Sequence, residues 1–126
     1  MDQKQFEQLV NEGIARLPKH ILEKVDNAAV TIADNPTADQ LRRAKIQPGN
    51  LLLGLYEGVP KTVWGRGFGG NLPDKITIFQ KPIETIAQTD EEIKHLVAKT
   101  VWHEVAHHFG FDEEGVRGME RESKKL

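Results

Sequence analysis

The sequence contains no cysteine, so it can form no disulfide, no thiol nucleophile and no zinc site built on thiolates. An excess of charge of one sign is also missing, because 17 Lys and Arg against 19 Asp and Glu leave a formal net charge of -2. So small a net charge gives no general attraction to nucleic acid or to an anionic membrane surface. No apolar run approaches the roughly 20 residues that a membrane-spanning helix requires. We therefore expect neither nucleic acid nor a membrane as a partner.

The first residues lack the apolar stretch behind a basic start that marks a signal peptide, so we expect a cytoplasmic protein. The composition indicates a globular protein, since 38% of the 126 residues are hydrophobic and 29% are charged. A chain of this length is long enough to bury one core and too short for two. We interpret residues 1–126 as a single domain and leave its oligomeric state open.

Helices are predicted near the two ends of the chain. Apolar residues three and four apart predict an amphipathic helix over residues 6–17, which Pro18 ends. A second, longer helix begins with a capping pattern at Thr89 or Asp90 and continues until Gly110 ends it.

Strands are predicted between these helices. β-branched and apolar runs predict them within residues 25–33, 51–56 and 75–80. A return strand at residues 61–64 is a further candidate, and a glycine-rich loop follows over residues 65–70. The predicted order of helix, strands and long helix gives an α+β domain.

The long helix contains the sequence His-Glu-Val-Ala-His at residues 103–107, which has the spacing HExxH. Residues four apart lie one helical turn apart on one face, so the imidazoles of His103 and His107 can bind the same cation. The helical period rotates Glu104 by about 100° from His103 and places its carboxylate beside the metal. From there Glu104 can accept a proton from a metal-bound water.

Two residues after the motif extend this pattern. Gly110 can adopt the left-handed conformation that ends a helix and turns the chain back. Glu113 lies ten residues after His103, where its carboxylate can complete a set of two His ligands and one Glu ligand with a position left for water. Asp112, one residue earlier, is the alternative third ligand. The pattern predicts a catalytic zinc site.

A hydrogen-bonded cluster of His and Glu inside a core helix is the competing interpretation. Buried imidazoles beside a buried carboxylate are costly unless they are paired or bound to metal. The helix is apolar on most sides around the motif, which predicts such burial and favours the metal. The apolar residues form two columns, one of Val97, Val101, Val105 and Phe109 and another of Trp102 and Ala106.

The remaining ionisable residues carry weaker signals. His108 lies about 100° round the helix from His107 and is not expected to bind the same ion. His95, on the long helix, and His20, in a predicted loop, are expected at the surface. Three residues could stabilise a developing oxyanion, and no spacing selects among them: Tyr56, Arg66 and Arg117.

At these residues the sequence resembles the zincins, and more closely the small single-domain bacterial zinc metallopeptidases called minizincins. The family signature is similar to residues 103–113, which read HEVAHHFGFDE. Residues 53–60 (LGLYEGVP) and 72–79 (LPDKITIF) are also similar to the family. The resemblance covers most of the chain.

The resemblance implies a minimal zincin-like fold, in which a small mixed sheet packs on the motif helix. It also implies zinc bound by His103, His107 and an acidic residue after the glycine. The family more often carries Asp where this chain has Glu113, whose side chain is one methylene longer. Larger zincins bind an extended peptide along an edge strand above the helix, which by similarity points to residues 75–80.

These observations together predict a zinc-dependent metallopeptidase with Glu104 as the general base on a zinc-bound water. A zinc-dependent RNA hydrolase is one alternative, which the net charge of -2 and the presence of Glu104 disfavour. A non-catalytic, zinc-stabilised binding module is the other alternative, because so small a domain has little room for a substrate cleft.

Overall fold

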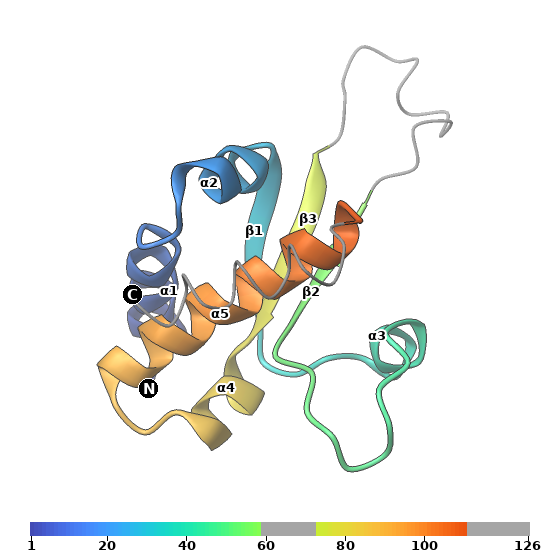
Figure 1. The fold of residues 1–126 in the computed structure, drawn as a ribbon. Coiled ribbons are helices and arrows are strands. Elements are labelled where there is room, and N and C mark those ends of the chain that lie inside the picture. The colour runs from blue at the N-terminus through green and yellow to red at the C-terminus, as the bar shows by residue number, and fades with distance from the viewer. Residues whose placement is uncertain (59–72, 111–126) are drawn as a thin grey trace.

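A computed structural model describes residues 1–58 and 73–110, which form one long helix across a three-stranded sheet (Figure 1). The strand order is β1-β3-β2, with β1 at Ala28–Ala33, β2 at Gly54–Glu57 and β3 at Asp74–Phe79. β1 runs parallel to β3, and β2 runs antiparallel to it. The predicted α+β class and the small mixed sheet are confirmed.

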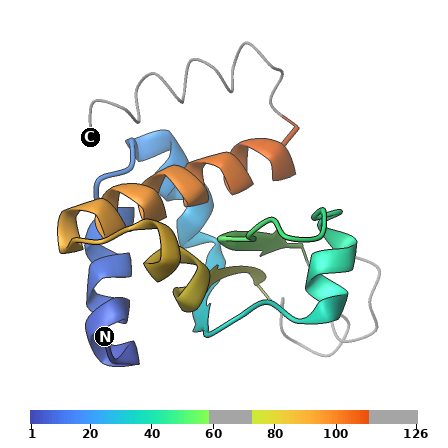
Figure 2. The same cartoon turned by 90° about the horizontal axis from the view of Figure 1, so that it is seen from below.

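Helices flank this sheet in the described part of the chain. The long helix α5 contacts both α1 and β2 and crosses one face of the sheet. Figures 1 and 2 both place α3 at the opposite end of the molecule from α1. The bounds are α1 at Gln3–Ile14, α2 at Lys19–Asp26, α3 at Ala38–Arg43, α4 at Gln80–Ile86 and α5 at Asp90–His108.

The two predicted helices are present and begin at side-chain caps. The Asp2 carboxylate accepts a hydrogen bond from the backbone N–H of Gln5, whose own side chain bonds back to Asp2 and completes a capping box at α1. At α5 the Thr89 hydroxyl accepts from the backbone N–H of Glu92, as the capping pattern predicts. Gly110 follows α5 with a φ of 70°, in the left-handed region where a glycine carries no steric penalty.

Helix α2 lies between the first predicted helix and the first predicted strand, in a stretch expected to be a loop, and its last two residues fall within the predicted strand range of 25–33. Pro18 does not simply end α1, which stops at Ile14, but forms the N-cap of α2. Ile21 and Val25, four residues apart, are buried on one face of α2. The strand therefore begins at Ala28, after this helix.

Helices α3 and α4 are also absent from the predicted order. α3 begins with a capping box between Thr37 and Gln40, a signal that its sequence contains. α4 follows β3 directly, so Gln80, expected at the end of a strand, is the first residue of a helix. Each helix is too short to show a clear apolar period.

The apolar side of α5 forms much of the core. The predicted burial of its two columns is confirmed for five side chains, which are at most 2% exposed: Val97, Val101, Trp102, Val105 and Ala106. Phe109 is 41% exposed, so its predicted burial is wrong. It lies at the C-cap, where the backbone leaves the helix and turns the side chain off the buried face.

The candidate strand at residues 61–64 and the glycine-rich loop at residues 65–70 lie outside the described residues. Within the described ranges, no helix combines the length and the hydropathy that crossing a membrane requires.

Candidate metal centre

The two histidines of the HExxH motif lie on α5 with their rings side by side. The ring centroids of His103 and His107 are 6.0 Å apart, and the ring planes differ by 18°. Two imidazoles on one tetrahedral zinc ion have centroids about 5 Å apart, given Zn–N bonds of about 2.0–2.1 Å. His107 is exposed, so a side-chain rotation can close the remaining distance. The donor atoms and the spacing of this pair therefore fit a zinc ion.

The carboxylate of Glu104 lies between α5 and the neighbouring edge of the sheet. Its Oε1 accepts a hydrogen bond of 2.9 Å from the backbone N–H of Tyr56 in β2. Burial raises the pKa of Glu104 above its usual value, and the hydrogen bond from Tyr56 and the charge of His107 offset part of that rise. A carboxylate with a raised pKa accepts a proton more readily at neutral pH than an exposed carboxylate does.

The raised pKa of Glu104 makes the stability of the metal-free protein depend on pH. The folded pKa lies above the usual value of 4.5, so the folded state binds this proton more tightly than the unfolded chain does. The stabilisation that proton binding at Glu104 gives is complete at low pH and is lost as the pH rises through the pKa of Glu104 in the folded state. We expect Glu104→Gln to weaken this decline in the free energy of unfolding, measured by urea denaturation with a chelator from about pH 4 to about pH 8. An identical pH dependence in both proteins would contradict the raised pKa.

Two glycines allow β2 and the C-terminal half of α5 to lie side by side in the same direction. A methyl group at Gly54 would lie 2.8 Å from Cγ2 of Thr100, and one at Gly58 would lie 2.9 Å from Cε1 of His108. The four residues from Gly54 to Gly58 span about 13 Å of strand, and the eight residues from Thr100 to His108 span about 12 Å of helix. Because these two lengths are nearly equal, both contacts can form at once. The hydrogen bond to the motif carboxylate forms midway between them.

A second group of contacts joins the end of α5 to the sheet. The Tyr56 hydroxyl donates a hydrogen bond of 2.8 Å to Oδ2 of Asp74, at the start of β3. Nε2 of His108 lies 3.9 Å from the same oxygen, and the His108 ring stacks on the Tyr56 ring with centroids 3.9 Å apart. Burial and the Asp74 carboxylate raise the pKa of Tyr56 above its usual value. Tyr56, one of the candidate oxyanion donors, therefore directs its hydroxyl to Asp74.

Removal of the Tyr56 hydroxyl is expected to weaken the fold without removing the ring stack. Tyr56→Phe takes one donor from the partly buried Asp74 carboxylate, so the free energy of unfolding should fall by about 1–2 kcal/mol. Urea denaturation measures this change. In a double-mutant cycle with Asp74→Asn the two costs should not add, and full additivity would contradict the coupling.

The third predicted ligand lies outside the described part of the chain. This holds for Glu113 and for its alternative Asp112, and also for the oxyanion candidates Arg66 and Arg117. Among residues 1–58 and 73–110, no group of three or more His, Asp and Glu side chains could hold a metal ion. The described residues thus supply two imidazoles on one helix face, and the third ligand stays a prediction.

The expectation that a peptide pairs along an edge at residues 75–80 is wrong. β3 is the central strand, with β1 paired along one side and β2 along the other, so it has no open edge. The strand beside the motif is β2. The Phe79 N–H donates to the Leu53 carbonyl, so the backbone groups of Leu53 and of every second residue after it point to β3. Tyr56 is not in this series, and its N–H points away from β3 to Glu104. The outer edge of β2 therefore lies next to the motif carboxylate.

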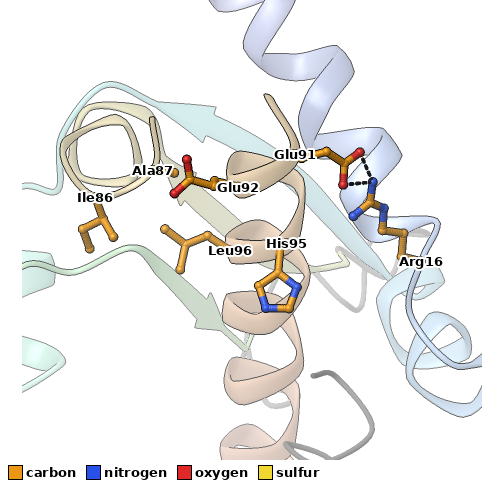
Figure 3. A pocket seen from close by; sticks show the side chains of 7 residues that line it. All are labelled: Arg16, Ile86, Ala87, Glu91, Glu92, His95 and Leu96. Carbon is orange, nitrogen blue, oxygen red and sulfur yellow. Dashed lines mark hydrogen bonds and ion pairs between the residues drawn. The ribbon is translucent and has the colours of Figure 1, made fainter. Parts of the chain in front are cut away.

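The other histidines lie away from the motif. His20 is exposed on α2 rather than in a loop, and its ring meets the Trp102 ring edge-on with centroids 6.4 Å apart. His95 is partly buried and lines a pocket of about 430 Å³ between the end of α1, α4 and the start of α5 (Figure 3). There Arg16 donates to both carboxylate oxygens of Glu91. Neither histidine joins the HExxH pair.

Comparison with known families adds one match to this geometry. A family model described as zincin-like metallopeptidase matches residues 25–122. The match begins near the end of α2 and includes all three strands and the whole of α5. No curated protein matches the chain.

Proposed function

Because the chain belongs to the zincin-like metallopeptidase family, we propose that it is a zinc-dependent peptidase with Glu104 as its general base. The position of Glu104 carries the proposal. Its carboxylate is bound to the backbone of a sheet edge, and it lies on the same helix as the paired imidazoles of His103 and His107. Hydrolysis of an amide requires such a base within reach of both a metal and a bound peptide.

The residues that would hold the metal come from the motif helix and the chain that follows it. His103 and His107 supply two nitrogen donors, and Glu113 supplies the third ligand, with Asp112 as its alternative. When bound, zinc acts as a Lewis acid toward a carbonyl oxygen and lowers the pKa of water.

Glu104 carries the protons of the reaction. Its carboxylate accepts a proton from the attacking water and then donates it to the leaving amine. The hydrogen bond from Tyr56 to Oε1 orients the carboxylate and leaves Oε2 for this transfer. Partial burial favours the same role, because it raises the pKa toward neutral.

A peptide substrate would pair with the outer edge of β2, in place of the strand first expected. The edge lies beside Glu104, which takes the Tyr56 N–H, and the outward-facing Tyr56 carbonyl and Gly54 backbone groups are the ones that an extended chain would pair with. Main-chain pairing there would present successive amide bonds of the substrate to the base.

Zinc content tests the metal site directly. We expect about one zinc ion per chain in the wild-type protein by elemental analysis and a loss of zinc in His107→Ala. His108→Ala is the matched control, because it alters the adjacent imidazole and should keep the metal. Zinc contents that do not differ among the three proteins would exclude His107 as a ligand and remove the basis of the proposal.

A further inference from the structure

We infer that a pocket beside His103 and Glu104 binds the C-terminal residue of a peptide, with an aliphatic side chain inside the pocket and the free carboxylate at Lys99. The inference rests on the proposed function for cleavage, whereas the binding can be tested without any hydrolysis. The pocket has a volume of about 320 Å³, at the small end of the range of about 300–1,000 Å³ for ligand pockets. That volume suits one or two residues rather than a longer segment.

The walls of this pocket are mostly apolar. Leu53 and Gly54 line it on the sheet side, and Leu96 and Thr100 line it on the helix side. Both leucines pack against the hydrophobic core, which fixes their positions. Gly54 lets β2 approach the helix at this wall, because a Cβ there would lie 2.8 Å from Cγ2 of Thr100. An aliphatic side chain placed in the pocket would be removed from water and would need no polar partner.

Lys99 adds a positive charge to these apolar walls. Within residues 1–58 and 73–110 no carboxylate pairs with Lys99, whereas Lys94 on the same helix pairs with Glu12 at 2.9 Å and with Glu91 at 3.5 Å. The motif carboxylate that also lines the pocket is bound to the sheet edge instead. An ammonium beside low-dielectric walls attracts a carboxylate more strongly than it would in open water. The complementary ligand therefore carries a carboxylate next to its aliphatic side chain.

The direction of β2 places the C-terminal end of a bound peptide at the pocket. A peptide that pairs antiparallel with the outer edge of β2 runs from the Tyr56 end to the Gly54 end. The bond to be cleaved lies at Glu104, which contacts Tyr56, and Gly54 lies two residues, or about 7 Å, further along this edge. The residue in the pocket is thus one or two positions after the cleaved bond. A carboxylate at that point is the C-terminus of a short downstream product.

Binding of N-acetyl-L-leucine tests the inference, because this probe has both features and is not expected to be hydrolysed at an internal peptide bond. We expect it to shift the backbone amide NMR signals of Leu53, Gly54 and Thr100 in the purified full-length protein. N-acetyl-L-leucinamide lacks the carboxylate and should bind about threefold more weakly, as expected for a partly exposed ion pair. N-acetylglycine lacks the side chain and should also bind more weakly.

Variants at Lys99 assign the carboxylate preference. Lys99→Gln should bind the acid and the amide with equal affinity, and Lys99→Arg should keep the preference for the acid. Lys81→Gln, at an exposed lysine on α4, is the control and should keep it as well. If bound zinc rather than Lys99 attracted the carboxylate, the preference for the acid over the amide would persist in Lys99→Gln. Loss of this preference in the variant therefore assigns it to Lys99. Equal binding of the acid and the amide by the wild type would overturn the inference and indicate that the pocket takes an internal residue of the substrate. Signal shifts confined to other surfaces would also overturn it.

Discussion

Glu104→Gln is expected to lower kcat/KM for a peptide substrate by about 10²–10⁴-fold while the zinc content stays at the wild-type level. Glutamine keeps the size of the side chain, and its amide oxygen can still accept the hydrogen bond from the Tyr56 N–H. The amide cannot accept and return a proton as the carboxylate does. The variant therefore separates the chemistry of this side chain from its structural contact.

A steady-state assay on a peptide that the wild-type protein cleaves measures this effect. The matched control is Glu92→Gln, an exposed acidic residue in the first turn of the same helix, which should leave the rate unchanged. Hydrolysis by Glu104→Gln at the wild-type rate would rule out the general base. Normal zinc content with no hydrolysis of any peptide by the wild type would favour a non-catalytic binding module instead.

Gly13→Ala is expected to lower the free energy of unfolding by about 2 kcal/mol. In a helix without close neighbours the same change stabilises a protein by about 0.5–1 kcal/mol, so the predicted sign is the opposite of the usual one. The reason is the packing of α1 on α5, because a methyl group at Gly13 would lie 2.6 Å from the backbone oxygen of Lys94. A backbone atom cannot rotate away, so the two helices would have to separate.

Urea denaturation with an unchanged m-value would measure this loss. Gly58→Ala is the control, because its methyl group would meet the exposed ring of His108, a side chain that can move, and its cost should be smaller. A Gly13→Ala variant as stable as the wild type would show that α1 does not pack on α5 as closely as described.

Helix α5 could be predicted because its signals are local. Its apolar periodicity, the cap at Thr89 and the glycine at position 110 all lie within one stretch of sequence. The placement of His103 and His107 on one face follows from the helical period alone.

The short helices could not be predicted in the same way. α3 has no buried residue, so its capping box at Thr37 is not accompanied by an apolar face. α2 buries Ile21 and Val25 and also contains Leu22, but its eight residues make only about two helical turns, which is too short to establish a period. The neighbouring strand residues have a stronger β signal, which extended the predicted strand into α2.

The partners of the motif depend on contacts between distant parts of the chain. Tyr56 and Glu104 are 48 positions apart, and only the packing of β2 on α5 brings them together. The central position of β3 is likewise set by pairing with two strands, one of them parallel and far away in sequence. A run of apolar residues indicates a strand but not its place in the sheet, so the sequence alone does not distinguish the edge strand that the resemblance implies at residues 75–80 from a central strand.

The matched spans of β2 and α5 also fix the number of residues between Gly54 and Gly58. One inserted residue would displace the following backbone by about 3.3 Å and turn every later side chain to the opposite face. The contacts of Gly54 with Thr100 and of Gly58 with His108 could then not both form, so β2 would no longer fit beside the helix that carries Glu104, although the HExxH motif remained intact. The length of this segment is therefore constrained together with its two glycines.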